Sequence, residues 1–87
     1  MILEFTKRFK RSYKKLDPQA QKIIQKTLQQ LENDFSHPSL RVKKMKGYKN
    51  VWESSGNMDV RITFEIEKPD KLILRNCDHH DETLSNT

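Results

Sequence analysis

Residues 60–66 read VRITFEI, so that apolar and polar side chains alternate without a break. Successive side chains of a β-strand point to opposite faces of a sheet, and this alternation therefore predicts a strand over residues 59–67 with one buried face. Two further apolar segments, residues 51–55 and 71–77, flank it at short distances along the chain. Because connections this short are typical of hairpins, we expect three consecutive antiparallel strands.

The first half of the chain shows helical patterns after a short apolar segment. Residues 1–5 are predicted to form a strand, and Thr6 is the expected N-cap of a helix over residues 7–15. A second helix is predicted over residues 17–33, begun by an aspartate cap and a proline at the first helical position. The residues that follow are expected to be mostly loop, apart from a short extended piece at 42–46. The order of elements is that of an α+β protein.

Length and composition restrict the class of protein. The 87 residues suit one domain, expected to span residues 1–87, and exclude a multidomain enzyme. Lys and Arg number 17 and Asp and Glu 12, and the net charge of +5 favours an anionic partner, either a polyanion or an acidic protein. The single Cys77 excludes an internal disulfide, and no stretch matches a signal peptide or a membrane span. We therefore expect a cytoplasmic protein.

Most of the positive charge lies in two clusters. Six of the first fifteen residues are basic, and so are five of the nine residues 41–49, which include no acid. These five are Arg41, Lys43, Lys44, Lys46 and Lys49. Such runs are often only solvated surface, and for the first helix this alternative stays open. The second cluster precedes strands with further basic groups, and we expect it to contact a phosphate chain together with Arg75 and His79.

Arg61 and the pair His79 and His80 supply the groups that cleavage of an RNA phosphodiester needs. Imidazole has an unperturbed pKa of about 6.5, so it gives or takes a proton at neutral pH. A permanent cation such as Arg61 stabilises the extra negative charge on the pentacoordinate phosphorus, and no metal is then required. The alternative is a structural role, in which Arg61 pairs across the sheet with Glu53 or Glu65.

A zinc site at residues 77–80 is a further alternative, because thiolate and imidazole both bind zinc. Neighbouring strand side chains point to opposite faces, however, and no second Cys/His pair has ligand spacing. No metal ion or other cofactor is therefore expected.

Four segments together resemble the RelE/ParE superfamily of bacterial toxin–antitoxin toxins, particularly the RelE- and YafQ-like mRNA interferases. They are TKRFKRSYKKL at residues 6–16, KKMKGYKNVWE at 43–53, VRITFEI at 60–66 and HHDETL at 79–84. The resemblance implies two N-terminal helices packed on one face of a four-stranded antiparallel sheet. It also implies an endoribonuclease that cleaves mRNA in the ribosomal A site, through attack of a 2′-hydroxyl that leaves a cyclic phosphate, and a cognate acidic antitoxin as inhibitor.

The resemblance also implies roles for individual residues. Arg61 matches the arginine that supports the transferring phosphate, and His80 matches the terminal histidine that transfers protons. Lys44 and Lys46 fall where RelE-like toxins keep a pair of lysines, and they complete the expected catalytic set. Two alternatives stay open, namely a ParE-like inhibitor of DNA gyrase without catalysis and an RNA-binding module without turnover.

Overall fold

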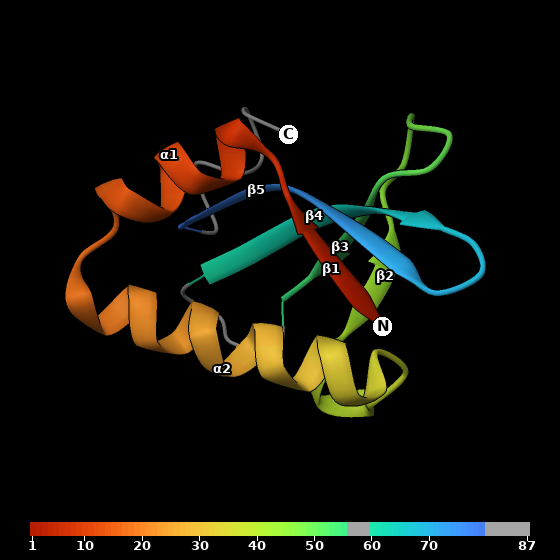
Figure 1. The fold of residues 1–87 in the computed structure, drawn as a ribbon, viewed down its shortest axis with the longest axis horizontal. Coiled ribbons are helices and arrows are strands. Elements are labelled where there is room, and N and C mark those ends of the chain that lie inside the picture. Colours follow the sequence, from red (N-terminus) through yellow and green to blue (C-terminus); the bar gives the residue numbers. More distant parts are fainter. Residues whose placement is uncertain (56–59, 80–87) are drawn as a thin grey trace.

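The structure, a computed structural model, describes residues 1–55 and 60–79 (Figure 1). Its α-helices are α1 (Lys7–Lys15) and α2 (Pro18–Asp34). Its strands are β1 (Ile2–Phe5), β2 (Val42–Lys44), β3 (Trp52–Ser54), β4 (Val60–Glu67) and β5 (Lys71–His79). A short 3-10 helix, η1 (Pro38–Leu40), precedes β2. Neither α-helix in these two ranges is long and apolar enough to cross a membrane.

The sheet has five strands in the order β1-β5-β4-β3-β2. The pairs β2–β3, β3–β4 and β4–β5 are antiparallel, as the short connections predict. β1 pairs with β5 in parallel, because two helices separate it from the next strand and leave its direction free. The expectation of four antiparallel strands is therefore wrong on both counts: the sheet is mixed, and the segment expected to be mostly loop contributes β2.

Both helices begin where their capping residues predict. The Thr6 hydroxyl oxygen accepts the N–H of Phe9 at 3.1 Å, and the Thr6 hydroxyl itself donates to the carbonyl of Leu74 at 2.7 Å. The Asp17 carboxylate accepts the N–H of Ala20 at 3.3 Å at the start of α2. Thr6 thus satisfies the first turn of α1 and also ties that turn to β5.

The core lies between the helices and one face of the sheet. Its buried apolar side chains are Phe9, Leu16, Ala20, Ile24, Leu31, Leu40, Val60, Ile62, Phe64, Leu72, Leu74 and Cys77. β4 supplies alternate residues to this core, as the VRITFEI pattern predicts. The intervening residues, including Arg61, are left to the opposite face of the sheet, and that face is the starting point for the site.

Candidate functional site

The sheet face turned away from the helices carries a row of polar residues. The pairing register aligns one residue from each of four neighbouring strands, namely Lys43, Glu53, Thr63 and Asn76. Directly opposed residues on neighbouring strands point to the same side of a sheet. Arg61 shares this side, because it is two residues from Thr63 on β4.

Arg61 is buried on this face and is held by an acidic neighbour. Its Nε lies 2.9 Å from Oε2 of Glu53, and the two side chains are 5% and 4% exposed. Arg61 on β4 and Glu53 on β3 are diagonal neighbours, because Glu53 is directly opposite Thr63. The Nε–H of Arg61 is not aligned with Oε2 of Glu53, so the contact is ionic and not a directed hydrogen bond. The other carboxylate oxygen of Glu53, Oε1, lies 3.2 Å from Nζ of Lys43, and the Lys43 side chain is 70% exposed. The structural role considered for Arg61, a cross-strand pair with Glu53, is therefore present.

The structure does not bring the predicted catalytic lysines to Arg61. Lys44 is opposite Trp52, which packs against the core, so Lys44 lies on the helix side of the sheet. Lys46 is exposed in the turn between β2 and β3. Lys43, expected only as an RNA contact, is the lysine of this cluster that shares the face of Arg61.

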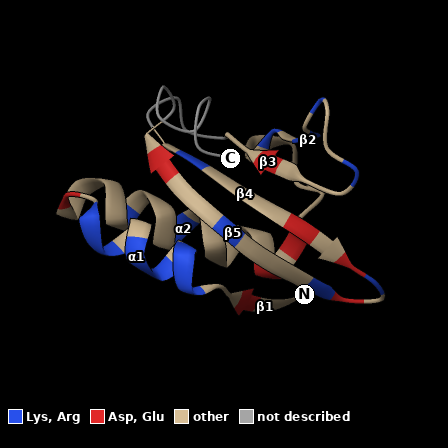
Figure 2. Cartoon of the chain, turned by 90° about the horizontal axis from the view of Figure 1, so that it is seen from above, with Lys and Arg blue, Asp and Glu red and all other residues tan. Residues whose placement is uncertain are grey.

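The other predicted RNA contacts are distributed around the sheet. Arg41 is exposed just before β2, and Lys49 is exposed in the β2–β3 turn, where Figure 2 shows basic residues gathered. Arg75 pairs with Glu65, its Nη1 lying 2.7 Å from Oε2, so the second acid considered as a partner of Arg61 has a basic partner of its own. His79 is opposite Val60, a core residue, and its Nε2 lies 3.6 Å from Asp17 Oδ1. His79 is therefore on the side of the sheet away from Arg61.

His80, the predicted proton-transfer residue, lies outside the described residues. The neighbouring Cys77 is buried in the core, and burial, assisted by the charge of Asp78, raises the pKa of its thiol to about 12. A thiol with this pKa is protonated at neutral pH, so it supplies neither a nucleophile nor a ready metal ligand. Within residues 1–55 and 60–79, no group of three or more His, Cys, Asp or Glu side chains is placed to hold a metal ion.

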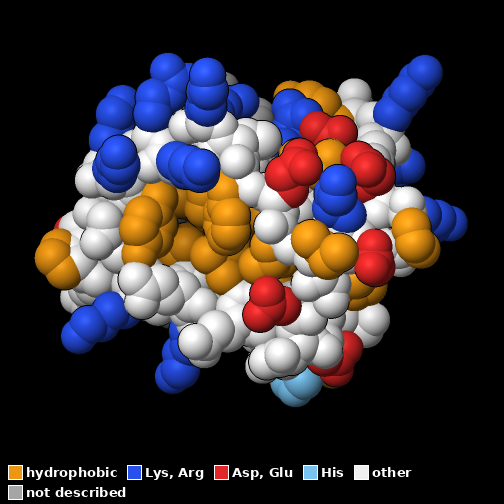
Figure 3. All heavy atoms as spheres, viewed as in Figure 1, with side chains coloured by type: hydrophobic (Ala, Val, Ile, Leu, Met, Phe, Trp, Pro, Cys, Tyr) orange, Lys and Arg blue, Asp and Glu red, His pale blue; other side chains and the backbone are white. Residues whose placement is uncertain are grey.

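An apolar hollow of about 300 Å³ opens between α1 and α2, and Figure 3 shows it as an orange depression below a band of basic side chains. Its lining residues are Phe5, Phe9, Lys10, Tyr13, Lys14 and Leu28. The two lysines place positive charge beside aromatic and aliphatic surface. None of the sequence patterns predicted this opening.

No protein-family model matches the chain, and no curated protein matches it by sequence. Solved structures do. A chain of the RelB–RelE antitoxin–toxin complex from Methanococcus jannaschii is 25% identical, with a TM-score of 0.76 over 95% of this chain and 96% of that one. A chain of a RelBE toxin–antitoxin complex from Mycobacterium tuberculosis is 20% identical, with a TM-score of 0.67 over 91% and 96%. YafQ from E. coli is 12% identical, with a TM-score of 0.70 over 93% and 94%.

These likenesses extend over nearly the whole of each chain. At 20% and 12% identity, the second and third likenesses concern the fold. The match to the complex from Methanococcus jannaschii, together with the sequence segments, supports the assignment of this chain to the RelE superfamily of type II toxin–antitoxin toxins.

Proposed function

We propose that the chain is the toxin of a type II toxin–antitoxin system and that it acts as an endoribonuclease on mRNA at the ribosome. The observation that supports this most is the position of Arg61, on the sheet face free of helices and beside Lys43. A guanidinium in that place can receive an RNA phosphate, and the exposed lysine next to it adds a second cation to the approach.

In the proposed reaction, the 2′-oxygen of RNA bonds to the neighbouring phosphorus and the bond from phosphorus to the 5′-oxygen breaks. A base takes the proton of the 2′-hydroxyl, and an acid gives a proton to the departing 5′-oxygen, so that a 2′,3′-cyclic phosphate remains. Arg61 stabilises the charge that develops on the phosphoryl oxygens. His80 is the proton-transfer residue, and the position of His79 on the other side of the sheet favours this choice.

For Arg61 to contact the reacting phosphate, it must leave its ionic contact with Glu53. Its side chain is 5% exposed and lies against Glu53, so a phosphate reaches it only when the surrounding side chains move. Lys43 offers Glu53 an alternative cation at 3.2 Å, so the carboxylate keeps a partner while Arg61 turns to the phosphate. RNA binding should therefore increase the mobility or change the environment of Glu53 and Arg61 together.

The test is mRNA cleavage in a ribosome-containing extract, mapped by primer extension, with a chelator present in one arm to check that no metal is needed. Arg61→Gln should lower the cleavage rate by about 10² to 10³, and His80→Gln by about 10² to 10⁴. Arg61→Lys keeps a cation beside Glu53 and separates lost chemistry from lost folding. Lys71→Gln, which removes a partly exposed lysine at the other end of β5, is the control.

A ParE-like inhibition of DNA gyrase is the competing function. If the Arg61 and His80 variants still arrest growth while mRNA stays intact, a gyrase supercoiling assay should show inhibition and the nuclease proposal is wrong. If neither gyrase nor mRNA is affected although RNA is bound, the chain is an RNA-binding module without turnover.

We also propose a cognate acidic antitoxin as partner, because two of the similar structures are toxin–antitoxin complexes. The net charge of +5 and the lysine-flanked apolar hollow between α1 and α2 suit an acidic amphipathic segment. Lys10→Glu with Lys14→Glu should weaken binding of the antitoxin encoded beside this gene, measured by calorimetry at two salt concentrations. Unchanged affinity would exclude the hollow as its docking surface.

A further inference from the structure

α1 has a polar, mostly basic side in addition to the apolar side that packs into the core. Arg8, Arg11, Ser12 and Lys15 follow one another at spacings of three, one and three residues, which places them on one side of the helix. The core residues of α1 belong to a different side, represented by Phe9. This polar side is turned toward the C-terminal half of β5, where β1 no longer covers the edge of that strand.

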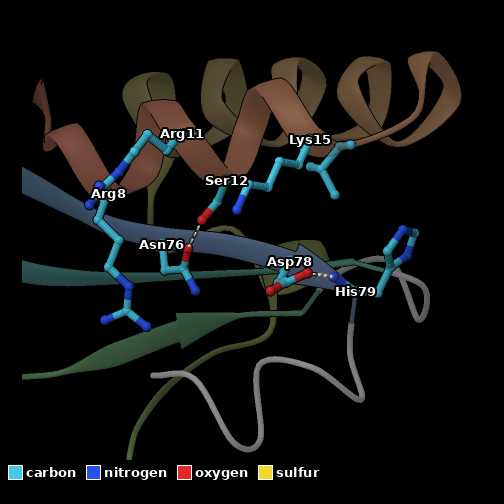
Figure 4. Close-up of a pocket in the computed structure, with 8 residues that line it drawn as sticks. Arg8, Arg11, Ser12, Lys15, Asn76, Asp78 and His79 are labelled. Carbon is cyan, nitrogen blue, oxygen red and sulfur yellow. Dashed lines mark hydrogen bonds between the residues drawn. The ribbon is translucent and has the colours of Figure 1, made fainter.

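A pocket of about 730 Å³ lies between this side of α1 and β5 (Figure 4). Figure 4 shows Arg8 and Arg11 at one end, Lys15 and His79 at the other, and Ser12 with Asn76 between them. The Ser12 hydroxyl donates to Oδ1 of Asn76, which links the helix to the strand across the middle of the pocket. The pocket is thus lined by cations at both ends and by neutral hydrogen-bonding groups in the centre.

The charge in the pocket is positive. Asp78 is the acid in its lining, and its Oδ1 accepts the backbone N–H of His79 at 2.9 Å. Asp17 approaches from α2 and contacts the His79 ring at 3.6 Å. Among residues 1–55 and 60–79, no carboxylate lies within 4 Å of the charged group of Arg11 or Lys15. These two cations are exposed and available to a bound anion.

The pocket adjoins the face that carries Arg61. Asp78 is the direct partner of Arg61 in the β4–β5 ladder, and Asn76 is the β5 member of the polar row that contains Glu53. Neighbouring strands are about 4.8 Å apart, so a ligand that lies over Arg61 reaches α1 by crossing β5 and passing round the part of its edge that β1 does not cover. A chain that leaves the candidate site in this direction therefore enters the pocket.

We infer that this pocket binds the phosphate backbone of single-stranded RNA beside the cleavage site. The inference rests on the proposed ribonuclease function. Arg8 and Lys15 are seven residues apart, or about 10 Å along the helix, which one phosphate cannot bridge and consecutive phosphates can. Phosphate oxygens accept hydrogen bonds from Arg, Lys, Ser and Asn alike, which is the mixture found here. An acidic protein segment would satisfy the cations but has no similar need for the central hydroxyl and amide.

The experiment uses the full chain and a fluorescein-labelled RNA oligonucleotide with 2′-O-methyl groups, which cannot be cleaved because the nucleophile is blocked. Its affinity is measured by fluorescence anisotropy over a series of KCl concentrations. The variant is Arg11→Gln with Lys15→Gln. The matched control is Lys22→Gln with Lys26→Gln, which removes two exposed cations at the same spacing from α2.

Loss of two phosphate contacts should reduce the slope of log affinity against log salt by about 1.4 for single-stranded RNA, which corresponds to roughly 70-fold weaker binding in 50 mM KCl if the lines converge at 1 M. The control should keep the slope of the unaltered protein. The proposal is overturned if the two double variants behave alike. It is also overturned if Arg11→Gln with Lys15→Gln loses affinity for poly-L-glutamate but not for RNA, because the pocket would then serve an acidic protein.

Cleavage measured in parallel separates this proposal from the ribonuclease function. The Lys22 and Lys26 double variant should cleave like the unaltered protein, whereas the Arg11 and Lys15 double variant should need a higher RNA concentration for half-maximal cleavage. If the unaltered protein cleaves RNA and the double variant binds it equally well, only the pocket proposal fails. If the unaltered protein binds the oligonucleotide through this pocket but cleaves no mRNA, the ribonuclease function fails and the pocket stands.

Discussion

Glu53 contacts two cations in very different surroundings, and this difference allows a sharp test of the ion pair that holds Arg61. Arg61 and Glu53 are both about 95% buried, whereas the Lys43 side chain is 70% exposed. Removing one member of a buried pair leaves the other desolvated and costs about 3–5 kcal/mol. An exposed pair contributes about 0–1 kcal/mol, because water screens it. Arg61→Gln should therefore destabilise the fold far more than Lys43→Gln, although both remove one positive charge from the same carboxylate.

The magnitudes can be measured by urea denaturation followed by circular dichroism. With a slope of about 1–2 kcal/mol per M for a domain of this size, Arg61→Gln should lower the midpoint by about 1.5 M or more and Lys43→Gln by about 1 M or less. Glu53→Gln should resemble Arg61→Gln, and the double variant should cost less than the sum of the single variants by about 1–3 kcal/mol. Equal effects of the Lys43 and Arg61 variants, or a coupling energy near zero, would refute the assignment of Arg61 to a buried pair.

Three further predictions concern the cap, the thiol and the tryptophan. Thr6→Ala should destabilise the protein by about 1–2 kcal/mol, since one hydroxyl caps α1 and ties it to β5, while Thr6→Ser retains most of the stability in the same urea assay. Because the folded pKa of Cys77 is raised from 9.0 to about 12, the unfolded thiol ionises first. Ionisation of this thiol does not affect stability below about pH 9, and above pH 9 it lowers stability by at most about 1.4 kcal/mol per pH unit. Cys77→Ala should lack this fall when melts at pH 8 and pH 10 are compared. Trp52→Ala should lower the melting temperature but leave RNA affinity unchanged, because the ring packs against the core. The ring is only partly buried, so the loss of stability should be smaller than the roughly 3–5 kcal/mol that truncating a fully buried tryptophan costs. Lost RNA affinity at unchanged stability would instead indicate base stacking.

Local sequence rules determined the elements with strong patterns. The bounds of α1 agree with the expected residues 7–15, and α2 begins after the predicted aspartate cap and ends at Asp34, one residue beyond the prediction. β4 follows from strict alternation, and β5 begins at the predicted Lys71. These features depend on neighbours within a few residues, where capping, periodicity and short connections act directly. The RelE resemblance was likewise visible in the linear order of four segments.

Only the tertiary structure decided what depends on pairing between distant segments. The sequence predicted a short extended piece at residues 42–46 but not that it joins the sheet, which it does as β2 because β3 offers it an edge. The parallel direction of β1 is set by its place beside β5 and not by its own four residues. Alternation on an edge strand puts Lys43, not Lys44, beside Arg61, and a shift of one residue in register would have reversed that choice.

The same reason explains the pocket between α1 and β5. The sequence shows six basic residues in the first fifteen, and the spacing of Arg8, Arg11 and Lys15 marks one side of a helix. It does not say what that side faces. Packing of Phe9 into the core orients α1, and β1 ends before the last residues of β5, so the open edge of β5 meets the basic side. The basic residues of α1 line a pocket because burial of one side of a helix determines where its other side points.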